Sequence, residues 1–248
     1  MKILIRFFKV IYSLYAIVSF ILLMLIVFPL ALVASLFGII RGGNMILRLC
    51  SAWSDVWFFL IGIRPKTIRT SVYPKKDEQY IFIANHISYL DVPMIVNFIR
   101  QPLRALGKSA MAKLPIFGFL YRYGAILVDR ESADARKKSV YQLKSVLRKG
   151  ISVFIFPEGT FNMGPDMLKS FYDGAFRIAI ETQTPLMPMV FPDTIKRLHY
   201  RSAFSFTPGI SRAIFLDKIP VDGLTLRDLP ALKEKVYKQM EEALKASR

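Results

Sequence analysis

Cysteine, histidine and acidic residues are scarce in this sequence of 248 residues. The single cysteine, Cys50, excludes an internal disulfide and a cysteine-rich metal site, and it is compatible with a reducing compartment. The two histidines, His86 and His199, are far apart along the chain, so the sequence predicts no metal site and the chemistry considered below requires none. Only 18 acidic residues oppose 35 lysines and arginines, which gives a net charge of +17.

This positive charge favours anionic partners, such as lipid headgroups, a phosphorylated substrate or an acidic carrier protein. Nucleic acid would also be attracted, but its usual signatures are missing. The sequence has no zinc-finger spacing, no basic-region zipper and no aromatic motif of an RNA-recognition sheet. We therefore expect no nucleic-acid partner.

Charged residues are absent from residues 10–40, and this apolar run predicts a membrane anchor. As one helix the run would be about 46 Å long, against a hydrocarbon core of about 30 Å. Pro29 and Gly38 allow a kink or a turn, which leaves a tilted span or a hairpin that dips into one leaflet. Basic residues flank the run on both sides and favour the hairpin. The run is too long for the apolar region of a secretory signal peptide.

A second apolar stretch, residues 45–63, carries Trp53 and Trp57 one helical turn apart. This placement suits a membrane interface, and the alternative is that both tryptophans pack on the following domain. We therefore assign residues 1–64 to hydrophobic membrane-anchoring helices and residues 65–248 to a folded domain.

Strand-like and helix-like patterns alternate after Arg64, which predicts an α/β domain with a mixed sheet flanked by helices. Three short apolar runs, residues 80–84, 126–128 and 151–156, predict strands that each end at polar residues. Because ligand sites of open α/β sheets lie beyond the carboxyl ends of strands, these polar ends predict one shared functional edge.

The remaining elements follow from caps and apolar spacing. Ser132 is a helix cap and Gly150 a stop, so a helix is expected between them. The other predicted elements are a helix over residues 173–183, an extended segment over 185–191, strands over 203–206 and 213–216, and a closing helix that starts near Pro230 and buries Leu232, Val236, Met240 and Ala243.

His86 follows the first predicted strand, and Asp91 stands at the start of a predicted helix five residues later. An imidazole held by a carboxylate can deprotonate a hydroxyl group. On a straight strand or helix the two side chains would point apart, so they work together only across a strand-to-helix turn. The alternatives are a structural histidine and a simple helix-capping aspartate.

Residues 85–91, NHISYLD, resemble the N-H-x-x-x-x-D block of the glycerolipid acyltransferases. Three further blocks resemble that family in the same order: GAILVDR at 124–130, FPEGT at 156–160 and the proline-centred PLMPMV at 185–190. Lys108 and PIFG at 115–118 resemble the family's upstream lysine and P-x-F-G. The length and the apolar N-terminus are most similar to the 1-acylglycerol-3-phosphate acyltransferases.

The resemblance implies that His86 removes the proton from the free hydroxyl of 1-acylglycerol-3-phosphate while Asp91 orients the imidazole. The oxygen would then attack an acyl thioester directly and give phosphatidic acid. Arg130 and Lys108 would hold the acceptor's phosphate. The acceptor-binding turn would comprise Glu158, Gly159 and Thr160.

The resemblance also implies no cofactor, with acyl-CoA or an acidic acyl-carrier protein as the acyl donor. The protein would lie in a membrane, among membrane lipids, with the catalytic domain of residues 65–248 facing the cytoplasm.

One residue departs from the family pattern: Phe161 follows FPEGT, where family members commonly have arginine. A phosphate-binding cation is thus missing at this position, and Lys169 is a downstream substitute. Phe161 also leaves open another acceptor, such as a lyso-aminolipid. Outside the enzymes, the alternative is a non-catalytic membrane protein that binds anionic lipid.

Overall fold

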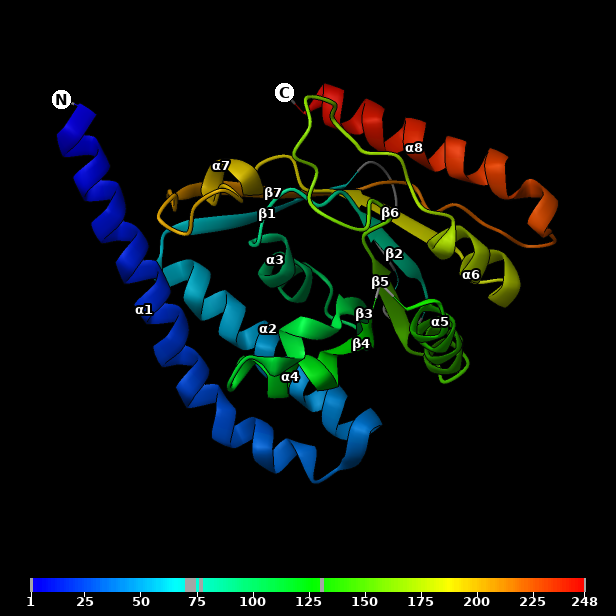
Figure 1. Ribbon diagram of the computed structural model, residues 1–248, viewed down its shortest axis with the longest axis horizontal. Helices are drawn as coiled ribbons and strands as arrows, with labels where there is room; N and C mark the ends of the chain where they lie inside the picture. Colours follow the sequence, from blue (N-terminus) through cyan, green and yellow to red (C-terminus); the bar gives the residue numbers. More distant parts are fainter. Residues whose placement is uncertain (1, 70–74, 76–77, 130–131, 248) are drawn as a thin grey trace. The chain divides into compact units, whose positions relative to one another are not determined.

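The computed structural model describes residues 2–69, 75, 78–129 and 132–247 (Figure 1). Its α-helices are α1 (Lys2–Ser35), α2 (Gly43–Leu60), α3 (Asp91–Phe98), α4 (Phe117–Gly124), α5 (Ala133–Leu147), α6 (Gly174–Thr182), α7 (Thr194–Arg197) and α8 (Leu229–Ala246). Its strands are β1 (Ile63–Arg69), β2 (Ile81–Ala84), β3 (Leu103–Lys108), β4 (Ala125–Val128), β5 (Ser152–Ile155), β6 (Leu186–Val190) and β7 (Gly209–Phe215). Shorter helical turns are η1 (Gly38–Gly42), η2 (Ser109–Lys113) and η3 (Leu226–Asp228).

The chain divides into two compact units. Unit one comprises Met1–Ile68, Ile87–Arg100 and Phe191–Ala213. Unit two comprises Arg69–His86, Gln101–Val190 and Ile214–Arg248. Strand β7 contributes residues to both units, and the strand order along the described sheet is β1-β7-β6-β2-β5-β3-β4.

Unit two contains the predicted parallel strands. Strand β2 pairs in parallel with β5 and β6, and β3 pairs in parallel with β4 and β5. The end of β7 runs antiparallel to β6. Five parallel strands therefore end at one edge of the sheet, and three of them, β2, β4 and β5, are the runs predicted to share it. The expected α/β class, with a mixed sheet flanked by helices, is confirmed.

In unit two, a capping serine and a glycine bound helix α5, and an apolar stripe anchors helix α8 in the core. The side chain of Ser132 accepts a hydrogen bond from Ala135 N at the start of α5. Gly150, with φ of +74°, follows the end of this helix. Helix α8 buries Leu232, Val236 and Met240 as expected, but Leu244 rather than Ala243 completes its apolar stripe.

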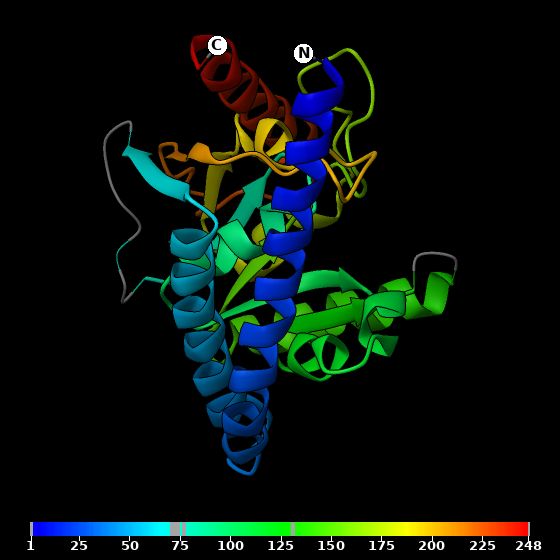
Figure 2. The same ribbon diagram turned by 90° about the vertical axis from the view of Figure 1, so that its left-hand side faces the viewer.

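Unit one contains a helical hairpin, which Figures 1 and 2 show as α1 descending and α2 returning beside it. Helix α1 continues through Pro29, and the chain turns at η1, where Gly38 has φ of +78°. The turn is therefore made at the glycine, which tolerates this backbone conformation, and not at the proline. The chain thus forms a helical hairpin of α1 and α2, and the choice between a tilted span and a hairpin in one leaflet stays a prediction.

Trp57 lies inside this hairpin, with 2% of its surface exposed. Its indole N–H donates to the carbonyl of Ala16 at 3.0 Å, and its ring stacks on Trp53 and meets the edge of Phe206. The prediction that Trp57 lies at a membrane interface is therefore wrong. The facing helix buries its large apolar ring and also accepts its N–H, so the residue needs no contact with water or headgroups.

The outer surface of α1 is strongly apolar. Residues Arg6–Ser35 form the one helix among the described residues that is long and apolar enough to cross a membrane. Its large exposed side chains include Leu22, Ile26, Val33 and, just beyond the helix, Leu36. An apolar face of this extent is typical of a surface that contacts lipid or protein.

Polar contacts join the hairpin to α3 within unit one. Asp55 of α2 forms a salt bridge with Arg100 at 2.6 Å and accepts a hydrogen bond from Asn97 at 2.7 Å. The hydroxyl of Ser51 donates to the carbonyl of Val96 at 2.7 Å. The hairpin is thereby tied to the helix that begins at Asp91.

The strand predicted at residues 203–206 is wrong, because these residues form turns and irregular backbone. Serine hydroxyls take the backbone donors that a strand would use. Ser202 accepts from Phe204 N at 3.1 Å, and Ser13 of α1 accepts from Phe206 N at 3.1 Å. Side-chain bonds of this kind compete with strand pairing.

Candidate active site

Four of the strands in unit two end beside one another in the order β2, β5, β3 and β4. His86 follows β2 by two residues, Glu158 follows β5 by three, and Lys108 is the last residue of β3. Lys108 is exposed and pairs in register with Val128 at the end of β4. Parallel pairing thus gathers three of the predicted site residues at one edge. Arg130 lies outside the described residues.

The backbone of His86 is held at both of its polar atoms. Its N–H donates to Oε1 of Glu158 at 2.9 Å, and its carbonyl accepts from Asn162 N at 2.7 Å. Both partners belong to the segment that contains the FPEGT motif. This motif therefore fixes the position of His86, which lies 72 residues earlier in the sequence.

The imidazole of His86 lies between two phenylalanine rings. It stacks on Phe156 with ring centroids 3.8 Å apart and an interplanar angle of 11°, and Phe161 packs against it at 4.3 Å and 58°. The histidine is half-buried. Two aromatic contacts restrict rotation of the ring and leave it partly accessible to a substrate.

Glu158 is fully buried. Its second oxygen, Oε2, accepts a hydrogen bond from Lys169 N at 2.9 Å. One carboxylate thus joins the backbone after β2 to the loop that precedes α6, through two charge-assisted hydrogen bonds. Its predicted contact with the acceptor stays a prediction, since the contacts described for its oxygens are with backbone N–H groups.

Gly159 and Thr160 complete a tight turn after β5, in which Gly159 N donates to Phe156 O at 3.0 Å. Gly159 has φ of +72°, and a Cβ atom there would lie 2.7 Å from the ring of Tyr172. Thr160 is exposed, and its hydroxyl donates to Phe161 O at 3.3 Å. The turn requires glycine, and it presents Thr160 at the surface beside the histidine loop.

Asp91 is the first residue of α3 and is fully buried in unit one. Its Oδ2 accepts hydrogen bonds from Ile87 N at 2.8 Å and from Ser88 N at 2.9 Å. These two residues directly follow His86 in the chain. The carboxylate therefore fixes the strand-to-helix turn that the spacing of the motif required.

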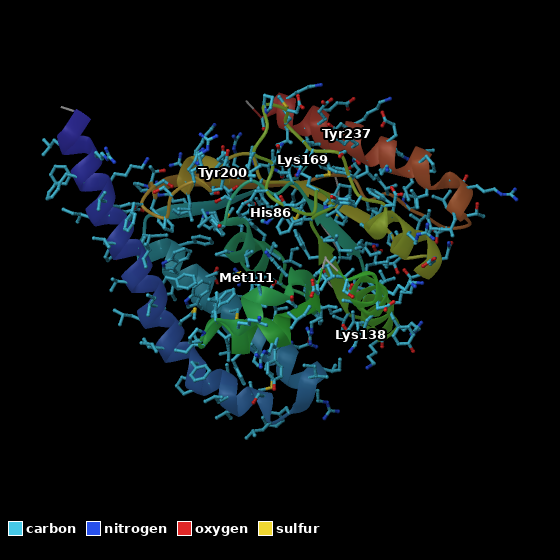
Figure 3. The ribbon with its side chains drawn as sticks, in the orientation of Figure 1. His86, Met111, Lys138, Lys169, Tyr200 and Tyr237 are labelled. Atoms are coloured by element: carbon cyan, nitrogen blue, oxygen red, sulfur yellow. The ribbon has the colours of Figure 1, made fainter. Side chains whose placement is uncertain are left out.

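A cleft of about 640 Å³ lies in unit two between the loop after FPEGT and helix α8. It combines apolar and charged side chains, and its lining includes Phe161, Lys169, Phe171, Lys233 and Tyr237. Figure 3 labels His86, Lys169 and Tyr237, and Lys169 lies between the other two in that view. The sequence indicated only the buried stripe of α8, so the lining residues Lys233 and Tyr237 were missed.

His199, the second histidine, lies in a loop of unit one. Its Nδ1 accepts from Arg201 N at 3.2 Å, and its ring lies 4.5 Å from that of Tyr200. These contacts occupy one ring nitrogen in local loop structure. No group of three or more histidine, cysteine or carboxylate side chains suited to a metal ion occurs among the described residues.

Within unit two, His86 after β2 is bonded to the segment that contains the Gly159 turn, and an imidazole held in this way can take the proton of a hydroxyl group. The sequence profile of the family described as Acyltransferase matches residues 66–192. The chain belongs to this acyltransferase family.

Curated relatives agree with this assignment. The chain is 27% identical over 220 residues to a 1-acyl-sn-glycerol-3-phosphate acyltransferase beta from Homo sapiens, covering 86% of this chain and 77% of that protein. It is 30% identical over 179 residues to a 1-acyl-sn-glycerol-3-phosphate acyltransferase from Haemophilus influenzae, covering 68% of this chain and 73% of that protein. The chain is therefore an acyltransferase similar to the 1-acylglycerol-3-phosphate O-acyltransferases.

The fold also matches a solved structure. The crystal structure of the 1-acyl-sn-glycerophosphate (LPA) acyltransferase PlsC from Thermotoga maritima superposes with a TM-score of 0.76 at 18% identity, covering 99% of this chain and 97% of the other. At this identity the match supports the fold, including the helices at the N-terminus.

Proposed function

We propose that this protein transfers a fatty acyl chain from an acyl thioester to the free hydroxyl of 1-acylglycerol-3-phosphate, giving phosphatidic acid. The fixed position of His86 carries the proposal. Its backbone is bonded on both sides to the FPEGT segment, and its ring lies between Phe156 and Phe161. A general base that is held in one position can accept the hydroxyl proton in a single, favourable geometry.

In the proposed reaction, neutral His86 accepts the hydroxyl proton through one ring nitrogen as the oxygen attacks the thioester carbonyl carbon. Asp91 orients the imidazole and stabilises its protonated form. The tetrahedral intermediate then expels the thiolate, to which the imidazolium returns the proton. Arg130 and Lys108 hold the acceptor's phosphate, and the Gly159–Thr160 turn lies against the acceptor.

The membrane supplies the lipid acceptor in this proposal. The exposed apolar surface of α1 supports insertion of the hairpin into one leaflet, with both of its ends on the same, cytoplasmic side. Acyl-CoA and acyl-carrier protein are both compatible donors, because each presents a thioester and an acidic group to a protein of net charge +17.

The test is transfer of a labelled acyl chain to 1-acylglycerol-3-phosphate by membranes that contain equal amounts of each variant. His86→Ala should lower kcat by about 10² to 10⁴, the usual contribution of a general base, and leave membrane association intact. His199→Ala, which removes the other histidine, is the control and should keep activity. Retained activity in His86→Ala would exclude His86 as the base.

A different lysolipid acceptor is the second candidate, and Phe161 favours it. This residue replaces the arginine that commonly follows FPEGT, and its ring packs against His86 rather than offering a charge. Initial rates of the purified protein with a panel of lysophosphatidate, lyso-aminolipids and other lysophospholipids would decide the acceptor. A preference for a lyso-aminolipid over lysophosphatidate would replace the leading proposal.

A further inference from the structure

The cleft between the 161–171 loop and α8 adjoins the histidine. Phe161 lines the cleft and its ring contacts the ring of His86, with centroids 4.3 Å apart. A molecule bound in the cleft against Phe161 would therefore extend toward the imidazole. In the proposed reaction, one end of an acceptor could occupy the cleft while its free hydroxyl lies beside His86.

The two lysines of the cleft differ in their surroundings. Lys233 forms a salt bridge with Asp173 at 2.6 Å, so its charge is largely neutralised. Lys169 is half-buried, lines the cleft and forms no salt bridge with any residue that the structure describes. Two carboxylates, Asp166 and Glu234, also line the cleft, and Glu234 forms a salt bridge with Lys238. Lys169 is thus the lysine of the cleft whose charge has no salt-bridge partner among the described residues.

Lys169 is also held near the histidine by the backbone. Its N–H and the N–H of His86 both donate to the carboxylate of Glu158, each at 2.9 Å. Because the two nitrogens bind one carboxylate, they are no more than roughly 8 Å apart. A lysine side chain that starts there can place its ammonium close to a substrate bound at His86.

The acceptor's own structure sets where a cation is needed. In 1-acylglycerol-3-phosphate, the phosphate is attached to the carbon next to the one that bears the free hydroxyl. A cation that holds this phosphate must therefore lie within a side-chain length of the base. The position after FPEGT supplies no cation here, because it is Phe161.

We propose that Lys169 binds the phosphate of the acceptor in this cleft, while Phe161 packs against the glycerol carbons and the imidazole. This assignment rests on the proposed function and deepens it. Lys108 is the last residue of β3, and Lys169 adds a cation from the loop before α6. A phosphate dianion commonly needs more than one positive partner.

The test measures the apparent KM for lysophosphatidate, the apparent KM for the acyl thioester and kcat, for the full chain in the membrane. Lys169→Met keeps the length of the side chain and removes its charge. It should raise the KM for lysophosphatidate about tenfold or more, the usual effect of losing a charge-assisted hydrogen bond. The KM for the thioester and kcat should change little, and Lys169→Arg should stay near wild type.

Lys149→Met is the matched control, since Lys149 is an exposed lysine at the end of α5 and does not line the cleft. If Lys169→Met behaves like this control, or raises only the KM for the thioester, Lys169 does not bind the acceptor's phosphate. Those results leave the proposed function in place. By contrast, a wild-type protein that transfers no acyl chain to lysophosphatidate would overturn the proposed function and this assignment together.

Discussion

The backbone N–H of His86 donates to Oε1 of Glu158 at 2.9 Å, and the carboxylate that accepts it is fully buried. Its other oxygen accepts from Lys169 N. A buried anion held in this way would repel a phosphate that approached it, so direct binding of the acceptor's phosphate would be unfavourable. The geometry favours a positioning role, in which Glu158 acts on catalysis through the placement of His86.

Glu158→Gln should therefore lower kcat about tenfold or more and leave both KM values nearly unchanged. The glutamine oxygen can accept from only one of the two N–H groups, those of His86 and Lys169. The other N–H faces the NH₂ group, which cannot accept a hydrogen bond. Steady-state kinetics with both substrates provide the measurement. Glu242→Gln, at an exposed position on α8, is the control. A raised KM for the acceptor at constant kcat would instead support the substrate-binding role predicted from the sequence.

Gly159→Ala should destabilise the protein by about 1–2 kcal/mol, because alanine strains a backbone with φ of +72°. The added methyl group would also contact the ring of Tyr172, but that side chain is exposed and can move. Denaturant unfolding of the single variant, Tyr172→Ala and the double variant separates the two causes. If Tyr172→Ala removes the whole cost, the ring contact and not the backbone is responsible.

Arg130→Ala should raise the apparent KM for lysophosphatidate far more than the KM for the thioester, because the family resemblance places this guanidinium on the acceptor's phosphate. Lys108→Met should have the same selectivity with a smaller effect, since lysine binds phosphate as a point charge. Initial rates over a range of both substrates give the two constants. Equal changes in both KM values would exclude the assignment of either cation to the acceptor.

The sequence predicted three strands of the sheet that end at one edge, because the apolar runs and the polar residues after them are local signals. The apolar runs before His86, before Asp129 and before Pro157 are β2, β4 and β5, and parallel pairing brings their ends together. Strands β1 and β3 were not predicted. Each carries charged residues, such as Arg64 and the buried Arg104, which hide the apolar pattern of a strand.

The contacts around His86 could not be predicted, because they depend on packing between distant segments. From the sequence, Phe161 indicated only that an arginine was absent at this position. In the structure, its ring contacts the imidazole of His86. Likewise, Glu158 was assigned to the acceptor by analogy, and its bonds to the N–H groups of His86 and Lys169 have no signal in spacing. The boundary of the anchor at residue 64 stays a prediction.

A last prediction concerns Asp193 and Arg212 of unit one. The Asp193 carboxylate accepts from Arg212 Nε at 2.6 Å, Nη2 at 2.7 Å and the backbone N at 3.1 Å. Burial alone would raise the pKa of Asp193, but the hydrogen bonds and charge of Arg212 outweigh burial and hold this pKa below its usual value. The pair therefore stabilises the folded protein fully above a pH of about 4 and less as the pH falls through the lowered pKa.

Asp193→Asn should lower the free energy of unfolding by about 2 kcal/mol at pH 7, because it leaves the arginine without its carboxylate. The difference from wild type should shrink as the pH falls below about 4 and through the lowered pKa of Asp193, where the wild-type carboxylate becomes protonated. Denaturant unfolding in detergent, followed by tryptophan fluorescence, measures both values. Lys196→Met removes the longer, exposed contact to the same carboxylate at 3.8 Å and should cost less than about 1 kcal/mol. A difference for Asp193→Asn that stays constant down to pH 2 would assign the stabilisation to packing rather than to charge.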